Sequence, residues 1–372
     1  MTIEQNSNNF LDPQINMDLI TYREALWNSM DTALKNDPRV IILGQGVDDH
    51  KGIFGSTKGL AEKYGSERVF DTPLAEEGVT GIAIGAALNG LYPITTHIRV
   101  DFSLLAMNQV VNLAAKYKYM FGGKFSVPML IRMVIGRSWG QGAQHSQSLQ
   151  SLYAHFPGLT VIMPASASSI ENCYAYAISQ HQGPVISIEH RLMYDLKYRK
   201  DQSVQSQHSS PSPFTSYKVR SGKDVTIVAT SIMVMEALRS AEFLSQVSHI
   251  DCEVIDLNCL SHPDQDLILA SVAKTGKLLV ADTSWIGYGV SAEVCRLICE
   301  KSPQSLKAPV SMLGMQAAPC PTAKSLEDLF YPNLHDLSDA IAKLVTGQHT
   351  HGIPLPDERS FADVYKRFKG PF

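Results

Sequence analysis

Two adjacent glutamates, Glu76 and Glu77, follow a proline-containing turn and open a run that is rich in glycine and alanine. The segment reads DTPLAEEGVTGIAIGAA from Asp71, and we expect its helix to cover residues 74–88. Glycine weakens a helix by about 1 kcal/mol per residue relative to alanine, so the glycines here need a packing or functional reason, such as the close approach of a flat ring. The two acids have an ordinary explanation, because negative charge in a first turn stabilises a helix. Local sequence alone favours that explanation.

A second polar segment, TTHIRVDF from Thr95 to Phe102, joins an expected strand to an expected helix. Asp101 is a candidate for the helix N-cap, and Phe102 would lie in the first turn, close to the carboxyl end of the strand. Ligands bind at that edge of open α/β sheets. Phe102 could therefore face a ligand, although a core aromatic residue is the more common case.

A glycine-rich polar loop, RSWGQGAQHSQ from Arg137 to Gln147, follows the next apolar run. His145 lies in this loop among small and amide side chains. Such surroundings can expose an imidazole to a pocket and set its tautomer. A solvated loop histidine explains the pattern equally well, and the local sequence does not decide between the two.

The elements that must position these residues alternate along the chain. A capping box, Thr21-x-x-Glu24, opens a helix that we expect to end near Asn36. Further helices are expected at 74–88, 101–120 and 168–180. Apolar strands are expected at 40–43, 92–98, 127–135, 159–163 and 185–189. Strands that are apolar throughout and separated by helices indicate a parallel sheet covered on both faces.

The composition shifts to Ser, Gln and Pro at residues 200–222, which is typical of a linker. The alternation then restarts, with strands expected at 225–229, 252–257, 278–281 and 310–313, and helices at 234–244, 264–273, 289–300 and 334–344. We therefore predict an α/β fold with two parallel-sheet domains. The predicted parts are a flexible arm (1–17), a first domain (18–200), a linker (201–222), a second domain (223–346) and a C-terminal tail (347–372).

The overall composition excludes several classes of protein. The 372 residues are 44% hydrophobic and 18% charged with a net charge of −4, and no basic stripe supports binding to nucleic acid. No apolar run approaches the roughly 20 residues that a membrane helix needs, and the N-terminus lacks the pattern of a signal peptide. The six cysteines are scattered without a CxxC pair, so we expect buried thiols, no metal site and a reducing, cytoplasmic compartment.

Taken together, the ordered segments resemble one family. They read DTPLAEEGVTGIAIGAALNGLYPI, VDFSLLAMNQVVNLAAK, YMFGG, AQHSQS, PGLTVIMPAS and ISIEHRLMYD, followed in the second domain by DTSWIGYGVSAEV and PTAKSLED. This order is similar to the beta subunit of thiamine-diphosphate-dependent 2-oxo acid dehydrogenases of the pyruvate and branched-chain type, within the transketolase-like superfamily. The resemblance implies a transketolase-like pyrimidine-binding domain at 18–200 and a transketolase C-terminal domain at 223–346.

The resemblance also implies roles for individual residues. Glu76, rather than Glu77, matches the glutamate that activates the cofactor by hydrogen-bonding the pyrimidine nitrogen N1′. Phe102 matches the aromatic residue that stacks on the aminopyrimidine, and Ile98 matches a residue that lines the same pocket. His145 matches an active-site histidine, which would bind the substrate carboxylate or an acyl acceptor, or relay a proton.

A carboxylate suits this cofactor for a chemical reason. The thiazolium C2 must lose a proton, and the cofactor's own 4′-amino group removes it after a shift towards an imino tautomer, which a carboxyl group at N1′ promotes. A dry, apolar site strengthens that hydrogen bond. The resulting carbanion adds to a 2-oxo acid, and the thiazolium then serves as the electron sink for the loss of CO2.

The diphosphate end of such a site has no counterpart in this sequence. The family holds the diphosphate through Mg²⁺ bound by a GDG segment and paired asparagines, and no GDG occurs here. The resemblance therefore implies an alpha subunit that binds the Mg²⁺, an α2β2 tetramer, and an association with a lipoyl acyltransferase core.

Departures from the family pattern leave the substrate open. His97 and Arg99 stand where apolar or small residues are usual, and SWGQGAQHS is atypical before the histidine. The leading hypothesis is a subunit that supports oxidative decarboxylation of a 2-oxo acid and acyl transfer to lipoamide. The alternatives are a split transketolase-like or acyloin-forming enzyme, and a non-catalytic subunit that only binds its partner. A nicotinamide dehydrogenase is disfavoured, because no strand is followed by G-x-G-x-x-G.

Overall fold

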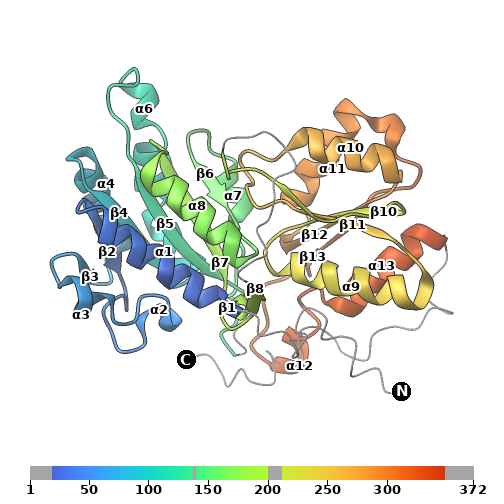
Figure 1. The fold of residues 1–372 in the computed structure, drawn as a ribbon, viewed down its shortest axis with the longest axis horizontal. Helices are drawn as coiled ribbons and strands as arrows, with labels where there is room; N and C mark the ends of the chain where they lie inside the picture. Colours follow the sequence, from blue (N-terminus) through green and yellow to red (C-terminus); the bar gives the residue numbers. More distant parts are fainter. Residues whose placement is uncertain (1–18, 137–139, 200–211, 348–372) are drawn as a thin grey trace.

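The computed structural model describes residues 19–136, 140–199 and 212–347. Two α/β domains lie side by side, each built on its own sheet (Figure 1). The predicted arm, the predicted tail beyond Gly347 and the first half of the predicted linker lie outside the described residues. None of the helices in the described part of the chain combines the length and the apolar character needed to cross a membrane.

The first domain contains six parallel strands in the order β3-β2-β4-β5-β7-β6. Their bounds are β2 Val40–Gly44, β3 Val69–Asp71, β4 Tyr92–His97, β5 Met129–Ile135, β6 Thr160–Ile162 and β7 Pro184–His190. Every residue of β4, β5 and β7 is buried, as expected for a sheet covered on both faces. Strand β3 is the only one of the six that the sequence did not predict.

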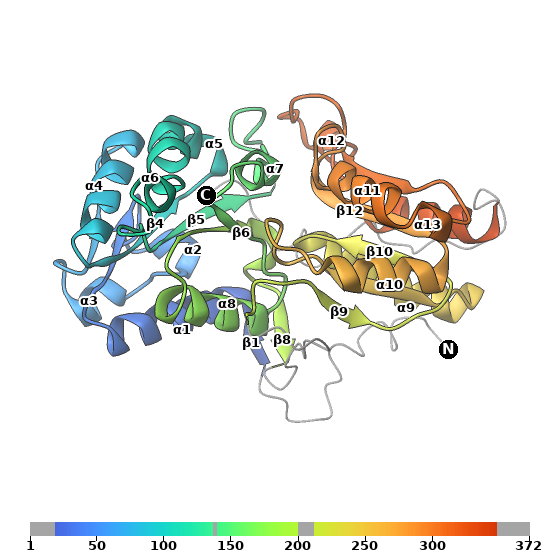
Figure 2. The ribbon, with the colours of Figure 1, turned by 90° about the horizontal axis from the view of Figure 1, so that it is seen from above.

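Helices cover both faces of this sheet (Figure 2). Helices α1 Tyr22–Asn36 and α8 Ala167–Ser179 pack together on one face, and α4 Glu76–Leu88 lies on the other. Shorter helices are α2 Gly52–Gly55, α3 Leu60–Tyr64 and α7 Gln150–Ala154. The predicted capping box is confirmed: Thr21 accepts a hydrogen bond from the Glu24 amide, and the Glu24 side chain accepts one from the Thr21 amide.

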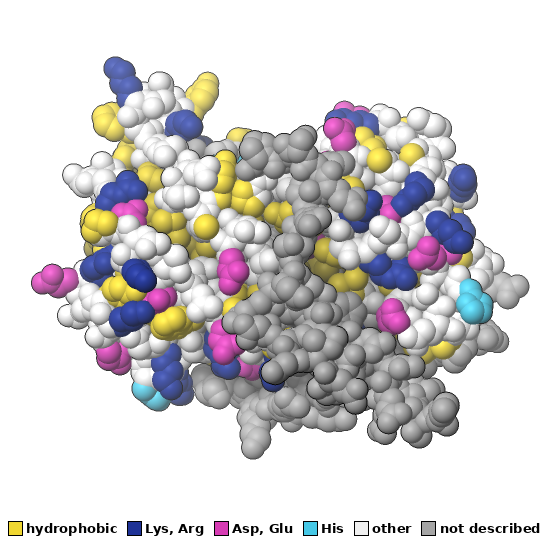
Figure 3. Space-filling view, viewed as in Figure 1, with side chains coloured by type: hydrophobic (Ala, Val, Ile, Leu, Met, Phe, Trp, Pro, Cys, Tyr) yellow, Lys and Arg dark blue, Asp and Glu magenta, His cyan; other side chains and the backbone are white. Residues whose placement is uncertain are grey.

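The continuous helix predicted for residues 101–120 is wrong. The segment divides into α5 Val100–Ser103, a 3-10 turn η2 Leu104–Ala106, a π-helix η3 Asn108–Ala114 and α6 Tyr117–Met120. Asp101 does not cap it, because its carboxylate accepts hydrogen bonds from Gln147 of a distant loop. Wide π turns commonly occur near functional sites. Tyr119 and Met120 of α6 are 91% and 60% exposed. Helix α6 forms a projecting tip (Figure 1), and hydrophobic side chains are visible at that end of the molecule (Figure 3).

The second domain has five strands in the order β13-β12-β10-β11-β9. Their bounds are β9 Tyr217–Arg220, β10 Val225–Ala229, β11 Cys252–Asp256, β12 Leu278–Trp285 and β13 Ser311–Met315. The sheet is parallel except for β9, which pairs antiparallel with β11 at one edge. Strand β9 lies inside the segment 201–222 that we interpreted as a linker, so the end of that segment belongs to the second sheet. The boundary between the two domains stays a prediction.

Helices also cover both faces of the second sheet, with α10 and α11 on one side and α9 and α13 on the other (Figure 1). The bounds are α9 Ile232–Ser248, α10 Gln265–Thr275, α11 Val290–Lys301, α12 Lys324–Glu327 and α13 Leu334–Thr346, with a 3-10 turn η5 Pro303–Ser305. A further 3-10 turn, η4 Arg191–Met193, follows β7 in the first domain. The six cysteines form no disulfide. The expectation that all are buried is wrong for two of them, because Cys299 is exposed and Cys295 is half-buried on α11.

Polar contacts tie the two domains together beside the loop that follows β5. The Gln150 amide donates to Asp282 Oδ1 over 2.9 Å, and the Ser284 hydroxyl donates to the Ser148 carbonyl over 2.9 Å. All four residues are buried. The short strands β1 Leu19–Thr21 and β8 Lys197–Arg199 pair antiparallel at the other side of the first domain. The loop that carries His145 is therefore held by both domains.

Candidate active site

The topology of the first sheet identifies one edge as the place for a ligand. The chain passes from β2 to β3 on one side, and then returns across β2 to β4 and continues in the opposite direction. The ends of β2 and β4 therefore flank a topological switch point, where open α/β sheets bind ligands at their carboxyl edge. Gly44 lets these ends approach, because a Cβ on this residue, whose φ is +155°, would lie 2.7 Å from the Thr96 carbonyl oxygen.

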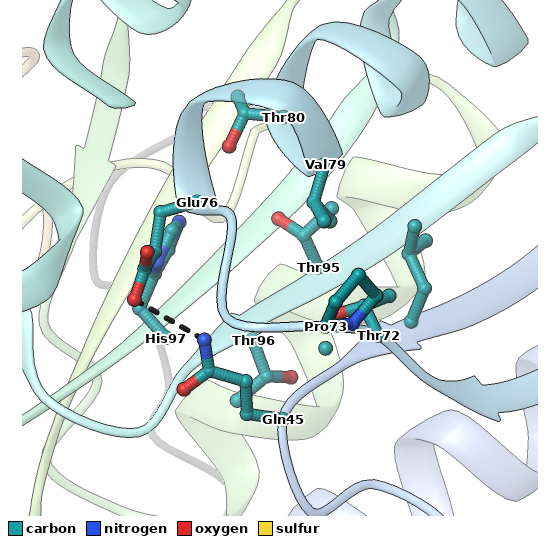
Figure 4. Close-up of a pocket in the computed structure, with 11 residues that line it drawn as sticks. Gln45, Thr72, Pro73, Glu76, Val79, Thr80, Thr95, Thr96 and His97 are labelled. Carbon is teal, nitrogen blue, oxygen red and sulfur yellow. Dashed lines mark hydrogen bonds between the residues drawn. The ribbon is translucent and has the colours of Figure 1, made fainter. Parts of the chain in front are cut away.

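A small, shallow pocket that is partly open to solvent lies at this switch point. It lies between the start of α4 and the ends of β2 and β4 (Figure 4). Its lining residues come from three parts of the chain and are Leu43, Gly44, Gln45, Thr72, Pro73, Glu76, Val79, Thr80, Thr95, Thr96 and His97.

Glu76 is the acid of this pocket. It is the first residue of α4, half-buried, and its Oε1 accepts a hydrogen bond from Gln45 Nε2 over 3.1 Å. The side chains of Glu76, Gln45 and His97 lie next to one another (Figure 4). Glu77 is exposed, and it accepts a hydrogen bond from Gln109 of the neighbouring π-helix over 3.0 Å. Of the two adjacent acids, only Glu76 lines the pocket.

The loop that carries Gln45 is held by Asp71, the last residue of β3. The Asp71 carboxylate accepts hydrogen bonds from the amides of Gly46, Val47 and Asp48. Sequence reasoning identified neither Gln45 nor the role of Asp71. Gln45 follows directly on the predicted strand β2, and that position is the signal that could have identified it, whereas Asp71 ends a strand that the sequence did not predict.

The end of β4 contributes three buried polar side chains to the pocket. Thr95 Oγ1, Thr96 Oγ1 and His97 Nε2 find no hydrogen-bond partner within the part of the chain that the structure describes. Burial of an unpaired polar atom costs about 1–3 kcal/mol. A pocket with such atoms is therefore suited to bind a polar molecule.

His97 is a neutral base in this pocket. Burial lowers its pKa to about 4, and the nearby carboxylate of Glu76 opposes this effect only in part. The imidazole therefore offers one donor and one acceptor at physiological pH. Because His97 is neutral, it provides no positive charge to balance the nearby carboxylate of Glu76.

Ile98 and Phe102 follow the same strand end. Ile98 is half-buried and comes directly after His97, while Phe102 is half-buried in α5. The Phe102 ring meets the His145 imidazole edge to face, with centroids 5.2 Å apart and planes at 88°. The structure thus brings together two of the predicted site residues that are 43 positions apart in the sequence.

The loop with His145 lies at the carboxyl end of β5, beside the end of β4. His145 is half-buried, and its amide donates weakly to the Gly142 carbonyl over 3.4 Å. Residues 137–139, which belong to the predicted loop motif, lie outside the described residues. Along this edge, the start of α4 supplies an acid, and the segments that follow β4 and β5 supply a neutral imidazole, an aromatic ring and a loop histidine.

This arrangement can bind a flat, polar, uncharged ring. The carboxylate of Glu76 can pair with a ring nitrogen from within the pocket. Ile98, Phe102 and His145 are not among the residues that line this pocket. Within residues 19–136, 140–199 and 212–347, no group of three or more His, Cys, Asp or Glu side chains is arranged to hold a metal ion. The carboxylate of Glu76 and the unpartnered polar atoms at the end of β4 are the kinds of group that could pair with the pyrimidine part of thiamine diphosphate.

Comparisons with known proteins point to one family. The model for the transketolase pyrimidine-binding domain matches residues 18–197, and that for the transketolase C-terminal domain matches residues 216–337. A rice protein (Oryza sativa subsp. japonica) named mitochondrial pyruvate dehydrogenase E1 component subunit beta-2 is 40% identical over 319 residues, which are 86% of this chain and 84% of that protein.

Other relatives come from bacteria and mammals. Pyruvate dehydrogenase E1 component subunit beta of Rickettsia bellii is 37% identical over 87% of this chain and 98% of its own length, and the mitochondrial subunit of Bos taurus is 39% identical over 87% and 90%. Among solved structures, a split gene transketolase described as an inactive beta4 tetramer matches with a TM-score of 0.70 and 23% identity, over 88% of this chain and 99% of that chain. That structural match supports the two-domain fold.

Proposed function

Since the chain belongs to the family of pyruvate dehydrogenase E1 component beta subunits, we propose that it activates thiamine diphosphate for the decarboxylation of a 2-oxo acid. The observation that carries the proposal is the position of Glu76, at the start of α4 and in the pocket at the switch point. Bound thiamine diphosphate supplies the nucleophilic carbon and the electron sink for this reaction.

Each predicted residue has a separate task in this proposal. Glu76 shares a proton with the pyrimidine N1′, and the Gln45 amide holds the carboxylate in place for this contact. Phe102 and Ile98 fix the plane of the ring through apolar contact. His145, at the other side of the Phe102 ring, binds the substrate carboxylate or relays a proton on the substrate side.

We also propose that the active site is shared between two different chains. The curated relatives are named as beta subunits, and the sequence has no GDG segment for Mg²⁺ and the diphosphate. An alpha subunit would hold the Mg²⁺ and the diphosphate in an α2β2 assembly, and a lipoyl acyltransferase would accept the acyl group. The six unbridged cysteines are in keeping with a reducing compartment such as the cytoplasm.

The test is a pair of substitutions in the complex reconstituted with the alpha subunit. Glu76→Gln replaces the carboxyl group with an amide, which cannot share a proton with the pyrimidine N1′. The change should reduce CO2 release by about 100-fold or more. Glu77→Gln is the matched control, because the same change one position away affects an exposed contact with Gln109. Equal activity of the two variants would refute the role of Glu76.

The acceptor is decided by a second assay on the same complex. A lipoyl domain should be acylated during turnover of the 2-oxo acid. Condensation with an aldehyde in place of lipoyl acylation would instead assign the chain to the transketolase-like or acyloin-forming enzymes, and absence of both reactions would leave a partner-binding role.

A further inference from the structure

Asp101 is a buried acid of α5 and the direct neighbour of Phe102 in the sequence. It is 8% exposed in α5, yet it does not cap that helix. Its Oδ1 accepts two hydrogen bonds from one residue, Gln147, whose backbone amide lies at 3.3 Å and whose Nε2 lies at 3.0 Å. Its Oδ2 is buried and has no hydrogen-bond partner among the described residues.

The clamp between Asp101 and Gln147 joins the two segments that carry the ring pair. Asp101 is the neighbour of Phe102 in the sequence, and Gln147 is two residues from His145. The edge-to-face contact at 5.2 Å therefore lies beside a pair of hydrogen bonds between the same two segments.

The loop needs such a contact because it has no regular structure of its own. Residues 140–149 form neither helix nor strand. The hydrogen bond from Ser284 to the Ser148 carbonyl holds the far end of the loop against the second domain. The Asp101 clamp holds Gln147 against the first domain, and the Tyr331 hydroxyl of the second domain donates to the carbonyl of the intervening Ser146 over 3.4 Å.

We propose that Asp101 is a positioning residue that fixes the Phe102–His145 ring pair by holding Gln147. The proposal rests on the function proposed above, because it assigns Asp101 an effect on catalysis through His145. A displacement of about 1 Å in such a pair is enough to reduce turnover by about 100-fold.

The variants are chosen to separate the hydrogen bond from the charge. Asp101→Leu removes the acceptor, whereas Asp101→Asn keeps an oxygen that Gln147 can reach. Gln147→Leu removes the side-chain donor and leaves the backbone donor, so it serves if Asp101→Leu does not fold. Asp266→Leu, at an exposed position on α10, makes the same chemical change far from the site.

The first measurement is the crystal structure of each variant in the complex with the alpha subunit. Asp101→Leu should separate or rotate the rings of Phe102 and His145, whereas Asp101→Asn should retain the edge-to-face contact. An unchanged ring pair in Asp101→Leu would overturn the proposal. This result does not depend on turnover, so it is informative even if the wild-type complex fails to release CO2, an outcome that would instead refute the proposed function.

The second measurement is a double-mutant cycle in the decarboxylation assay. Asp101→Leu should lower kcat by about tenfold to 100-fold, and Asp101→Asn should restore most of it. If Asp101 acts through His145, the Asp101→Leu change should have little further effect in a His145→Ala background. An equally large loss in that background would show that Asp101 acts by another route, and the positioning role would be rejected.

Discussion

The rings of Phe102 and His145 meet edge to face at a centroid distance of 5.2 Å, and they come from the ends of the neighbouring strands β4 and β5. Because both side chains are half-buried, each has one side on the protein and another that a ligand can reach. In the function that we propose, the pair would mark the boundary between the part of the site that binds the cofactor ring and the part that meets the substrate.

Replacement of Phe102 by leucine should weaken binding of thiamine diphosphate to the reconstituted complex. Loss of ring stacking is worth about 1 kcal/mol, which corresponds to an increase of about fivefold in the dissociation constant. Calorimetric titration of the complex with thiamine diphosphate measures this dissociation constant. Phe125→Leu provides the control, since that ring is 51% exposed beyond α6. A wild-type affinity in Phe102→Leu would contradict the stacking role.

Gln45→Leu should lower the turnover of the complex by about tenfold to 100-fold, because a hydrogen bond to a charged group contributes about 1.5–3 kcal/mol. The change removes the donor that faces Glu76 Oε1 and keeps a side chain of similar size. Gln109→Leu is the matched control, since it removes the corresponding amide from Glu77. Steady-state CO2 release compares the two, and equal losses would indicate a general effect of helix α4.

His97 should make the protein less stable as the pH falls below neutrality. Its pKa in the folded protein is about 4, whereas an ordinary histidine titrates near 6.5, so the unfolded chain binds the proton first. The contribution of neutral His97 to the free energy of unfolding is fully present above pH 6.5 and is lost as the pH falls towards 4. The whole change is about 3 kcal/mol.

His97→Phe should remove this component of the pH dependence. Urea denaturation at pH 5 and pH 7.5 gives the free energy of unfolding of the wild type and of the variant, and the difference between these two values is compared at the two pH values. His97→Gln is a second uncharged variant and should behave in the same way. A difference that does not change with pH would contradict the assignment of His97 as a buried neutral base.

Glu189→Gln should destabilise the first domain by about 3–5 kcal/mol, because it leaves a buried guanidinium without its counter-charge. Arg132 Nε and Nη2 donate to the two oxygens of Glu189 at 2.7 and 2.8 Å, and both side chains are fully buried between β5 and β7. The hydroxyls of Tyr174 and Tyr194 also donate to this carboxylate.

Denaturant unfolding measures the loss, with Asp328→Asn as the comparison. Asp328 pairs with Lys324 on the surface, where side chains are 40% and 58% exposed and water screens the charges, so its loss should be much smaller. Comparable losses for the two variants would show that the buried pair does not carry the expected energy.

The sequence alone determined the local elements and the chemistry that they could support. The capping box at Thr21 and Glu24, the apolar strands and most of the helices follow from contacts between residues a few positions apart, and such contacts are encoded in local patterns. The order of the motifs likewise indicated the family. The catalytic and binding roles of Glu76, Ile98, Phe102 and His145 stay predictions.

Only the tertiary structure decided which of these residues meet. The switch point between β2 and β4 arises from the order of the strands in the sheet. The contact of Gln45 with Glu76 joins residues 31 positions apart, and the clamp of Asp101 on Gln147 joins residues 46 positions apart. The same holds for the break in the helix after Phe102 and for the antiparallel strand β9. These features depend on which strands become neighbours and on which buried polar groups then find partners, and the local sequence does not encode that choice.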